Sequence, residues 1–195
     1  MKTAIVLLGI FIGIAAGALS FYGLFAPVNI REKEIGPFMF VMEQHVGAYK
    51  DVGPLIDKMQ KDLKDEGIET SMGVGIYYDD PKVTAEDKTR CIIGRIIEIN
   101  DRSRIIDIEK KYKVGELPQT NYLVVEFPFK GLPSIVIGIY RVYPKISKYM
   151  KTHEISKMPI IEIYAPKAQK MFYIVPTSLN QHFFDDLMNK VSPQG

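Results

Sequence analysis

Apolar and polar positions follow two similar series along this chain. Each series holds a strand-like run, a segment with apolar residues at helical spacing, and two further strand-like runs. The first series covers residues 38–45, 50–66, 74–78 and 91–97, and the second covers 122–127, 134–152, 160–164 and 171–175. Tyr78 and Tyr164 each end the strand after the helix, 86 positions apart. The pattern predicts an α+β fold built as a tandem βαββ repeat, with these two tyrosines in equivalent places.

An apolar run of 26 residues, 3–28, precedes the first series. A bilayer-spanning helix needs ~20 residues, whereas the apolar part of a signal peptide has ~7–15. We therefore predict a single-pass membrane anchor in residues 1–30 that adds nothing to the folded domain. A cleaved signal is the alternative, because Ala16-Gly17-Ala18 offers small residues for cleavage. Lys2 and the balanced charges of Arg31-Glu32-Lys33-Glu34 leave the side of the membrane undetermined.

One carboxylate falls inside an apolar strand near the end of the chain. Alternation with period two places Ile160, Glu162 and Tyr164 on one face of the strand and Ile161 and Ile163 on the other. A carboxylate among large apolar neighbours is costly to bury unless something pairs with it. Glu162 is therefore either a solvated residue on the sheet or the anchor of a binding site.

The helical and connecting segments carry further expectations. Residues 98–119 concentrate charges of both signs, which indicates a solvated linker with a helical turn near 105–112. Pro144 predicts a kink or a restart near Tyr143. Residues 179–191 have apolar spacing typical of a terminal helix. The buried side of the second helix is expected to hold Ile135, Ile139, Val142, Ile146, Tyr149 and Met150.

Composition narrows the classes of function. With 195 residues, 47% of them hydrophobic, the chain suffices for one membrane segment and one domain. A net charge of +2 without long runs of one sign argues against nucleic-acid binding. Cys91 lies in an apolar run, and His45, His153 and His182 are far apart in sequence. We accordingly expect no metal and no cofactor.

Several short motifs together resemble the GyrI-like effector-binding domains. They are Ile76-Tyr77-Tyr78-Asp79-Asp80-Pro81, Arg90-Cys91, Arg141-Val142-Tyr143-Pro144 and Glu162-Ile163-Tyr164. Within that superfamily they are most similar to the membrane-anchored testis-expressed protein 264 group. The resemblance implies a GyrI-like domain at residues 36–179, a pair of SHS2 units forming an antiparallel sheet with two helices on one face. It also implies a groove at the pseudo-twofold axis for small, often aromatic or cationic, ligands.

Carrying the family pattern over by position gives a candidate ligand site. Its residues are Glu162, Tyr164, Tyr78, Tyr49 and Glu126. No helix-turn-helix segment precedes the domain, and the long tail of the related autophagy receptor does not follow it. Residues 180–195 are expected to form a tail or short helix. Its Phe184-Asp185-Asp186-Leu187 fits the aromatic-x-x-aliphatic pattern that recruits autophagy proteins in that receptor.

Three functions remain open at this point. The first is a membrane-anchored domain that binds a small organic ligand at a tyrosine-lined groove with one carboxylate. The second is a membrane-tethered interaction protein that recruits a partner through its C-terminal tail or a sheet edge and binds no small ligand. The third is a hydrolase of small electrophiles with Glu162 as general base. No second acid, metal or nucleophile in the sequence supports catalysis, so binding is favoured over an enzyme.

Overall fold

The computed structural model describes residues 2–98 and 102–191. In that part of the chain one antiparallel sheet holds eight strands in the order β1-β6-β8-β7-β3-β4-β2-β5. The strands are β1 Arg31–Ile35, β2 Phe38–Val46, β3 Thr70–Tyr77, β4 Arg90–Ile97, β5 Lys113–Leu117, β6 Thr120–Pro128, β7 Ile160–Ala165 and β8 Lys170–Pro176. The helices are α1 Lys2–Phe21, α2 Val52–Asp65, α3 Arg102–Glu109, α4 Leu132–Thr152 and α5 Gln181–Val191. The predicted α+β fold with an antiparallel sheet is confirmed.

Two segments of the chain have the same order of elements. β2, α2, β3 and β4 follow one another in the first half, and β6, α4, β7 and β8 do so in the second. The third elements of the two halves, β3 and β7, pair with each other in the middle of the sheet. The place where the halves meet is therefore a pair of hydrogen-bonded strands.

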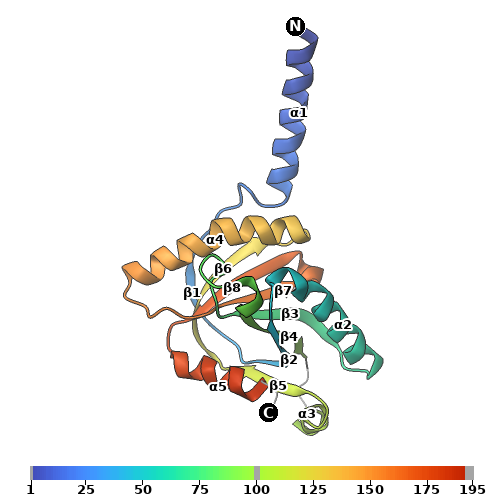
Figure 1. Cartoon of the computed structure of the whole chain (residues 1–195), viewed down its shortest axis with the longest axis vertical. Helices are drawn as coiled ribbons and strands as arrows, with labels where there is room; N and C mark the ends of the chain where they lie inside the picture. Colours follow the sequence, from blue (N-terminus) through green and yellow to red (C-terminus); the bar gives the residue numbers. More distant parts are fainter. Residues whose placement is uncertain (1, 99–101, 192–195) are drawn as a thin grey trace.

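The sheet is curled (Figure 1). It buries apolar side chains on both faces. On one face α2 and α4 cover separate clusters, which contain Leu63 and Ile146 respectively. On the other face α5 packs Phe184 and Leu187 into a cluster that draws on most of the strands. The two helices expected on one face are present, and α5 adds a helix on the opposite face.

The linker expected between the halves contains more structure than its charges suggested. The helical turn near 105–112 corresponds to α3, and a strand, β5, follows it and pairs with β2. β1 is equally charged and pairs with β6. Both lie at the edges of the sheet, where solvated charged side chains are common. Residues 99–101 of the predicted linker lie outside the described part.

α4 departs from the sequence expectation at two points. It begins after Gly131, whose φ of +96° suits glycine, with Pro133 in its first turn. The helix runs on through Pro144, so the restart predicted there does not occur. Ile139, expected on the buried side, is 41% exposed, and Gly138 is buried in its place.

α1 is exposed along its length, and its length and composition suit a membrane-spanning helix. It ends at Phe21, earlier than the apolar run in the sequence. Ala26, Val28 and Ile30 pack against the cluster under α4. The expectation that the first 30 residues add nothing to the domain is therefore wrong for residues 26–30.

Candidate functional site

Glu162 lies on β7, in the middle of the sheet, and is 1% exposed. Its neighbours Ile160 and Tyr164 belong to the cluster under α4, so the carboxylate points to the face that carries α2 and α4. The hydroxyl of Tyr143, from α4, donates a hydrogen bond of 2.6 Å to Oε1. The hydroxyl of Tyr164 donates to Oε2. Both carboxylate oxygens thus have a donor inside the protein.

The surroundings of Glu162 act on its pKa in opposite directions. Burial disfavours the charged carboxylate and raises the pKa, and the hydrogen bonds from Tyr143 and Tyr164 partly lower it. The net pKa is raised. Burial also raises the pKa of both phenols, so they remain protonated donors.

A cluster of tyrosine rings extends on both sides of the carboxylate. The hydroxyl of Tyr77, on β3, lies 3.5 Å from that of Tyr164. The ring of Tyr49, just before α2, meets the ring of Tyr77 edge to face at 4.9 Å between centroids. On the other side the rings of Tyr143 and Tyr173 are 5.8 Å apart. Aromatic rings around one carboxylate suit a cation or an aromatic ligand.

Two glycines of β3 lie opposite the site residues of β7. Gly75 pairs with Glu162, and Gly73 pairs with Tyr164. A methyl group on Gly75 would come within 2.8 Å of the ring of Tyr77, so this ring lies directly over the glycine backbone. The space at Gly75 is therefore occupied by a tyrosine side chain that can rotate about its own bonds.

The structure brings only part of the predicted site together. Glu162 and Tyr164 are in contact, and Tyr49 joins them through Tyr77. Tyr78 lies on the other face, where its hydroxyl donates 2.8 Å to the carbonyl of Phe184 in α5. The predicted equivalence of Tyr78 and Tyr164 is off by one residue. Tyr77 stands two residues after Gly75 as Tyr164 stands two after Glu162, and a shift of one residue moves a strand side chain to the opposite face.

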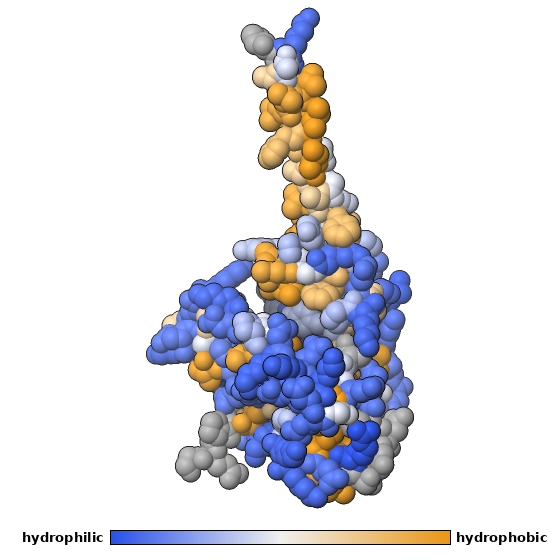
Figure 2. Space-filling view, turned by 90° about the vertical axis from the view of Figure 1, so that its right-hand side faces the viewer, coloured by the Kyte–Doolittle hydropathy of each residue, from blue (hydrophilic) through white to orange (hydrophobic). Residues whose placement is uncertain are grey.

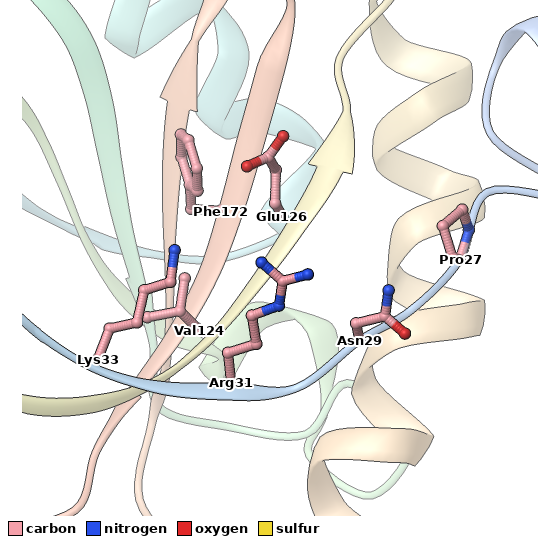
Figure 3. Close-up of a pocket in the computed structure, with 7 residues that line it drawn as sticks. All are labelled: Pro27, Asn29, Arg31, Lys33, Val124, Glu126 and Phe172. Atoms are coloured by element: carbon pink, nitrogen blue, oxygen red, sulfur yellow. The ribbon is translucent and has the colours of Figure 1, made fainter.

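Glu126 is also separated from Glu162. On β6 it alternates with buried residues under α4, so it points to the opposite face, 52% exposed and 2.6 Å from Nζ of Lys170. There it lines a cavity of about 230 Å³ at the β1 edge of the sheet, toward which the side chain of Arg31 is turned (Figure 3). The lining residues are Pro27, Asn29, Arg31, Lys33, Val124, Glu126 and Phe172.

Three site residues were missed by the sequence reading: Tyr77, Tyr143 and Tyr173. Alternation from Gly75 would have selected Tyr77, had the register been assigned correctly. Tyr143 lies next to Val142 on α4, and the apolar spacing that predicted the buried side of this helix did not include it. Tyr173 faces Glu162 across the β7–β8 pair, which only the strand register reveals.

Other reactive groups lie apart from this cluster. Cys91 is fully buried, and burial raises the pKa of its thiol to about 12. Within residues 2–98 and 102–191 no group of three His, Cys, Asp or Glu side chains is placed to hold a metal ion.

The sheet and its helices define a domain of α+β class, with a buried carboxylate where the two halves meet. The family model of the GyrI-like small molecule binding domain matches residues 28–176, and the chain belongs to this family. Testis-expressed protein 264 of Homo sapiens is 26% identical over 149 residues, which are 72% of this chain and 44% of the human protein. The Mus musculus homolog is also 26% identical, over 45% of its length. The chain thus spans less than half of the curated relatives it matches.

Solved structures share the fold at low identity. The EcmrR C-terminal domain superposes with a TM-score of 0.53 at 11% identity, over 76% of this chain and 96% of that domain. SAV2435 bound to tetraphenylphosphonium superposes with a TM-score of 0.51 at 11% identity, over 79% of this chain and 96% of that chain. At this identity the likeness shows the fold alone.

Proposed function

We propose that this chain is a membrane-anchored GyrI-like domain that binds a small organic ligand, cationic or aromatic, at Glu162. The observation that carries the proposal is a carboxylate 1% exposed between two halves of the domain, with a phenol on each oxygen. A lipophilic cation would neutralise the carboxylate, which is buried away from the water that would otherwise solvate it. The tyrosine rings would contact the surface of the cation. SAV2435, which shares the fold, was solved with a ligand of this chemical type, tetraphenylphosphonium.

Binding requires the tyrosines to move. The ring of Tyr77 covers Gly75, and the hydroxyls of Tyr143 and Tyr164 occupy the carboxylate oxygens. Rotation of Tyr77 and Tyr164 would expose Glu162 over the glycine backbone of β3. An arriving cation would then take the place of the phenol hydrogens and favour the charged carboxylate. The tyrosines would serve as a gate in the empty state and as the wall of the site in the bound state.

Membrane anchoring is the second part of the proposal. α1 has 20 residues, is apolar after Lys2 apart from Thr3 and Ser20, and contains no buried residue. Such a helix has the length that a bilayer core requires. α1 would therefore hold the domain at a membrane.

The alternative of an interaction tail meets an obstacle in α5. Phe184 is 0% exposed and Leu187 is 7% exposed, because both pack in the cluster under α5. A partner that reads Phe184-Asp185-Asp186-Leu187 would have to pull α5 out of the core. A hydrolase would likewise need the phenols to leave Glu162 before this residue could act as a base.

Titration calorimetry with tetraphenylphosphonium on the full chain in detergent micelles tests ligand binding. Glu162→Gln keeps the shape and removes the charge, so we expect affinity to fall by about tenfold or more, ~1.4 kcal/mol. Glu126→Gln is the matched control, since it removes a carboxylate on the other face and should leave affinity unchanged. Partitioning of the cation into micelles contributes equally to the titrations of all three proteins, so it cancels when their affinities are compared. Equal affinity of wild type and Glu162→Gln would remove Glu162 from the site.

A further inference from the structure

The outer face of α4 carries an apolar stripe. Leu132, Val136, Ile139 and Tyr140 follow each other at spacings of four, three and one, which places them on one side of the helix. They are 71%, 46%, 41% and 72% exposed. The opposite side of α4 is buried on the sheet, so a helix in water should carry polar residues here.

Exposed apolar residues are concentrated at this place. Outside α1, the large hydrophobic side chains exposed in the described part of the chain are Phe25, Val46, Val83, Ile106 and the four of the stripe. Val46, Val83 and Ile106 occur singly on different elements, which is normal for a protein surface. The stripe and Phe25 form the exception.

The stripe is tied at both ends to the segment that leaves α1. Near its start, the ammonium of Lys130 lies 5.3 Å from the centre of the ring of Phe21, the last residue of α1. At its end, Nη1 of Arg141 donates to the carbonyls of Gly23 at 2.8 Å and Ala26 at 2.6 Å. α4 consequently lies across the end of the domain from which α1 leaves (Figure 1).

These contacts determine where a bilayer would lie. If α1 crosses the hydrocarbon core, its end at Phe21 marks the boundary with water. Leu132 is two residues from Lys130, a distance of at most ~7 Å along the chain. Hydrophobic surface continues from α1 onto the adjoining end of the domain (Figure 2). The stripe is therefore at the level of the lipid headgroups, where aromatic and apolar side chains bind favourably.

We propose that the outer face of α4 lies in the interfacial region of the bilayer that α1 spans, with Leu132, Val136, Ile139 and Tyr140 inserted among the lipids. This inference rests on the membrane anchoring proposed above. Lys151 lies eleven residues after Tyr140, on the same side of α4, and is exposed. Its ammonium group would meet the phosphates of the headgroups. The α2 side of the domain would remain in water.

Tryptophan fluorescence provides a direct test, because the chain contains no tryptophan. Three variants of the full chain each carry one reporter: Phe11→Trp in α1, Tyr140→Trp on the stripe, and Gln60→Trp on the exposed side of α2. Each is reconstituted into vesicles of phosphatidylcholine and phosphatidylserine without bromine, with bromine on the acyl chains near the headgroup, and with bromine near the bilayer centre. We expect bromine near the centre to quench Phe11→Trp and bromine near the headgroup to quench Tyr140→Trp, both with emission at shorter wavelength, and neither to affect Gln60→Trp, which should emit as in water. Leu132→Trp repeats the stripe measurement at a second exposed position.

Each of the other possible outcomes overturns a defined part of the proposal. If Phe11→Trp is not quenched, α1 does not enter the bilayer, and the proposed anchoring fails together with the docking of α4. If Phe11→Trp is quenched while Tyr140→Trp and Leu132→Trp are not, the anchor stands and the docking is wrong. Stripe emission that is blue-shifted but insensitive to bromine would mean that protein, such as a second copy of the chain, covers the stripe. Quenching of Gln60→Trp to the same extent would mean that α4 has no special orientation.

Discussion

α2 and α4 occupy the same position in the two halves of the domain, yet their outer faces differ. Each follows the first strand of its half and packs on the same face of the sheet. The outer side of α2 carries charged residues, including an ion pair of 3.0 Å between Lys58 and Asp62. The outer side of α4 carries the stripe from Leu132 to Tyr140. The same backbone arrangement thus carries a helix with a charged outer side and a helix with an apolar outer side.

Their inner faces differ as well. α2 buries only apolar side chains, Val52, Met59 and Leu63. α4 buries Val142, Ile146 and Met150 beside the small residues Ser134 and Gly138, and it also delivers the hydroxyl of Tyr143 to Glu162. The two halves therefore differ in what they place around Glu162: the first supplies Gly75 opposite it, and the second supplies the carboxylate and the phenol of Tyr143 from α4.

The largest effect should come from the glycines of the two helices. A methyl group at Gly138 would overlap the hydroxyl of Tyr173, which is fully buried, whereas one at Gly53 in α2 would meet nothing within 4 Å apart from its neighbours in the chain. We expect Gly138→Ala to destabilise the domain by ~1–3 kcal/mol through overpacking. Gly53→Ala should change stability by less than ~0.5 kcal/mol, because the gain in helix propensity is offset by the contact of the new methyl group with the ring of Pro54, the next residue.

Urea unfolding of both variants in the same detergent, followed by circular dichroism, measures the difference between them. An equally small effect of both substitutions would mean that α4 does not lie as close to Tyr173 of β8 as in the structure. A loss of ~1 kcal/mol or more for Gly53→Ala would show that the exposed start of α2 has a further contact in solution.

A second prediction concerns the pH dependence that Glu162 imposes on stability. Its folded-state pKa is raised by burial above the ordinary value of 4.5, so the folded state holds this proton to higher pH than the unfolded state. Between the two pKa values the folded state binds more protons, and stability falls as pH rises from about 4.5 through the folded-state pKa. Glu162→Gln has no such group. From about pH 4 to pH 8, wild type should lose more than ~0.5 kcal/mol relative to this variant.

Unfolding free energies at a series of pH values give that difference directly. Glu126→Gln is the control: it removes a carboxylate from the other face of the sheet and leaves Glu162 in place, so the fall in stability that Glu162 causes should remain. Parallel curves for wild type and Glu162→Gln would show that the carboxylate is as well solvated in the folded protein as in the unfolded chain.

The two halves also show which parts of the fold can be predicted from the sequence. The strands of the central sheet were predicted because their alternating or continuous apolar residues are buried on at least one face. β1 and β5 were not, since their charged side chains at the sheet edges resemble linkers. These edge strands are held by backbone hydrogen bonds to β6 and β2, which leave no mark on side-chain pattern.

Only part of the candidate site could be predicted from the sequence, for a related reason. Glu162 and Tyr164 are two residues apart on one strand, so alternation alone assigned them to one face. Tyr77, Tyr143 and Tyr173 come from three other elements, and their assembly depends on strand register and on how α4 packs. An alignment shifted by one residue selected Tyr78, which points the other way.

The smallest predicted effect concerns the solvated side of α2. The Lys58–Asp62 pair spans one helical turn, with the two side chains 75% and 45% exposed. Lys58→Ala should cost only ~0.3–0.5 kcal/mol relative to Lys61→Ala, an exposed lysine of the same helix, because both changes have the same effect on helix propensity. The difference should vanish at about 1 M salt, where the Debye length is ~3 Å. Measured on the full chain in vesicles, the same salt dependence is expected, since ions reach α2 if this side of the domain stays in water. A difference that salt leaves unchanged would mean that Lys58 packs through its aliphatic stem, and α2 would then share with α4 a side that water does not fully solvate.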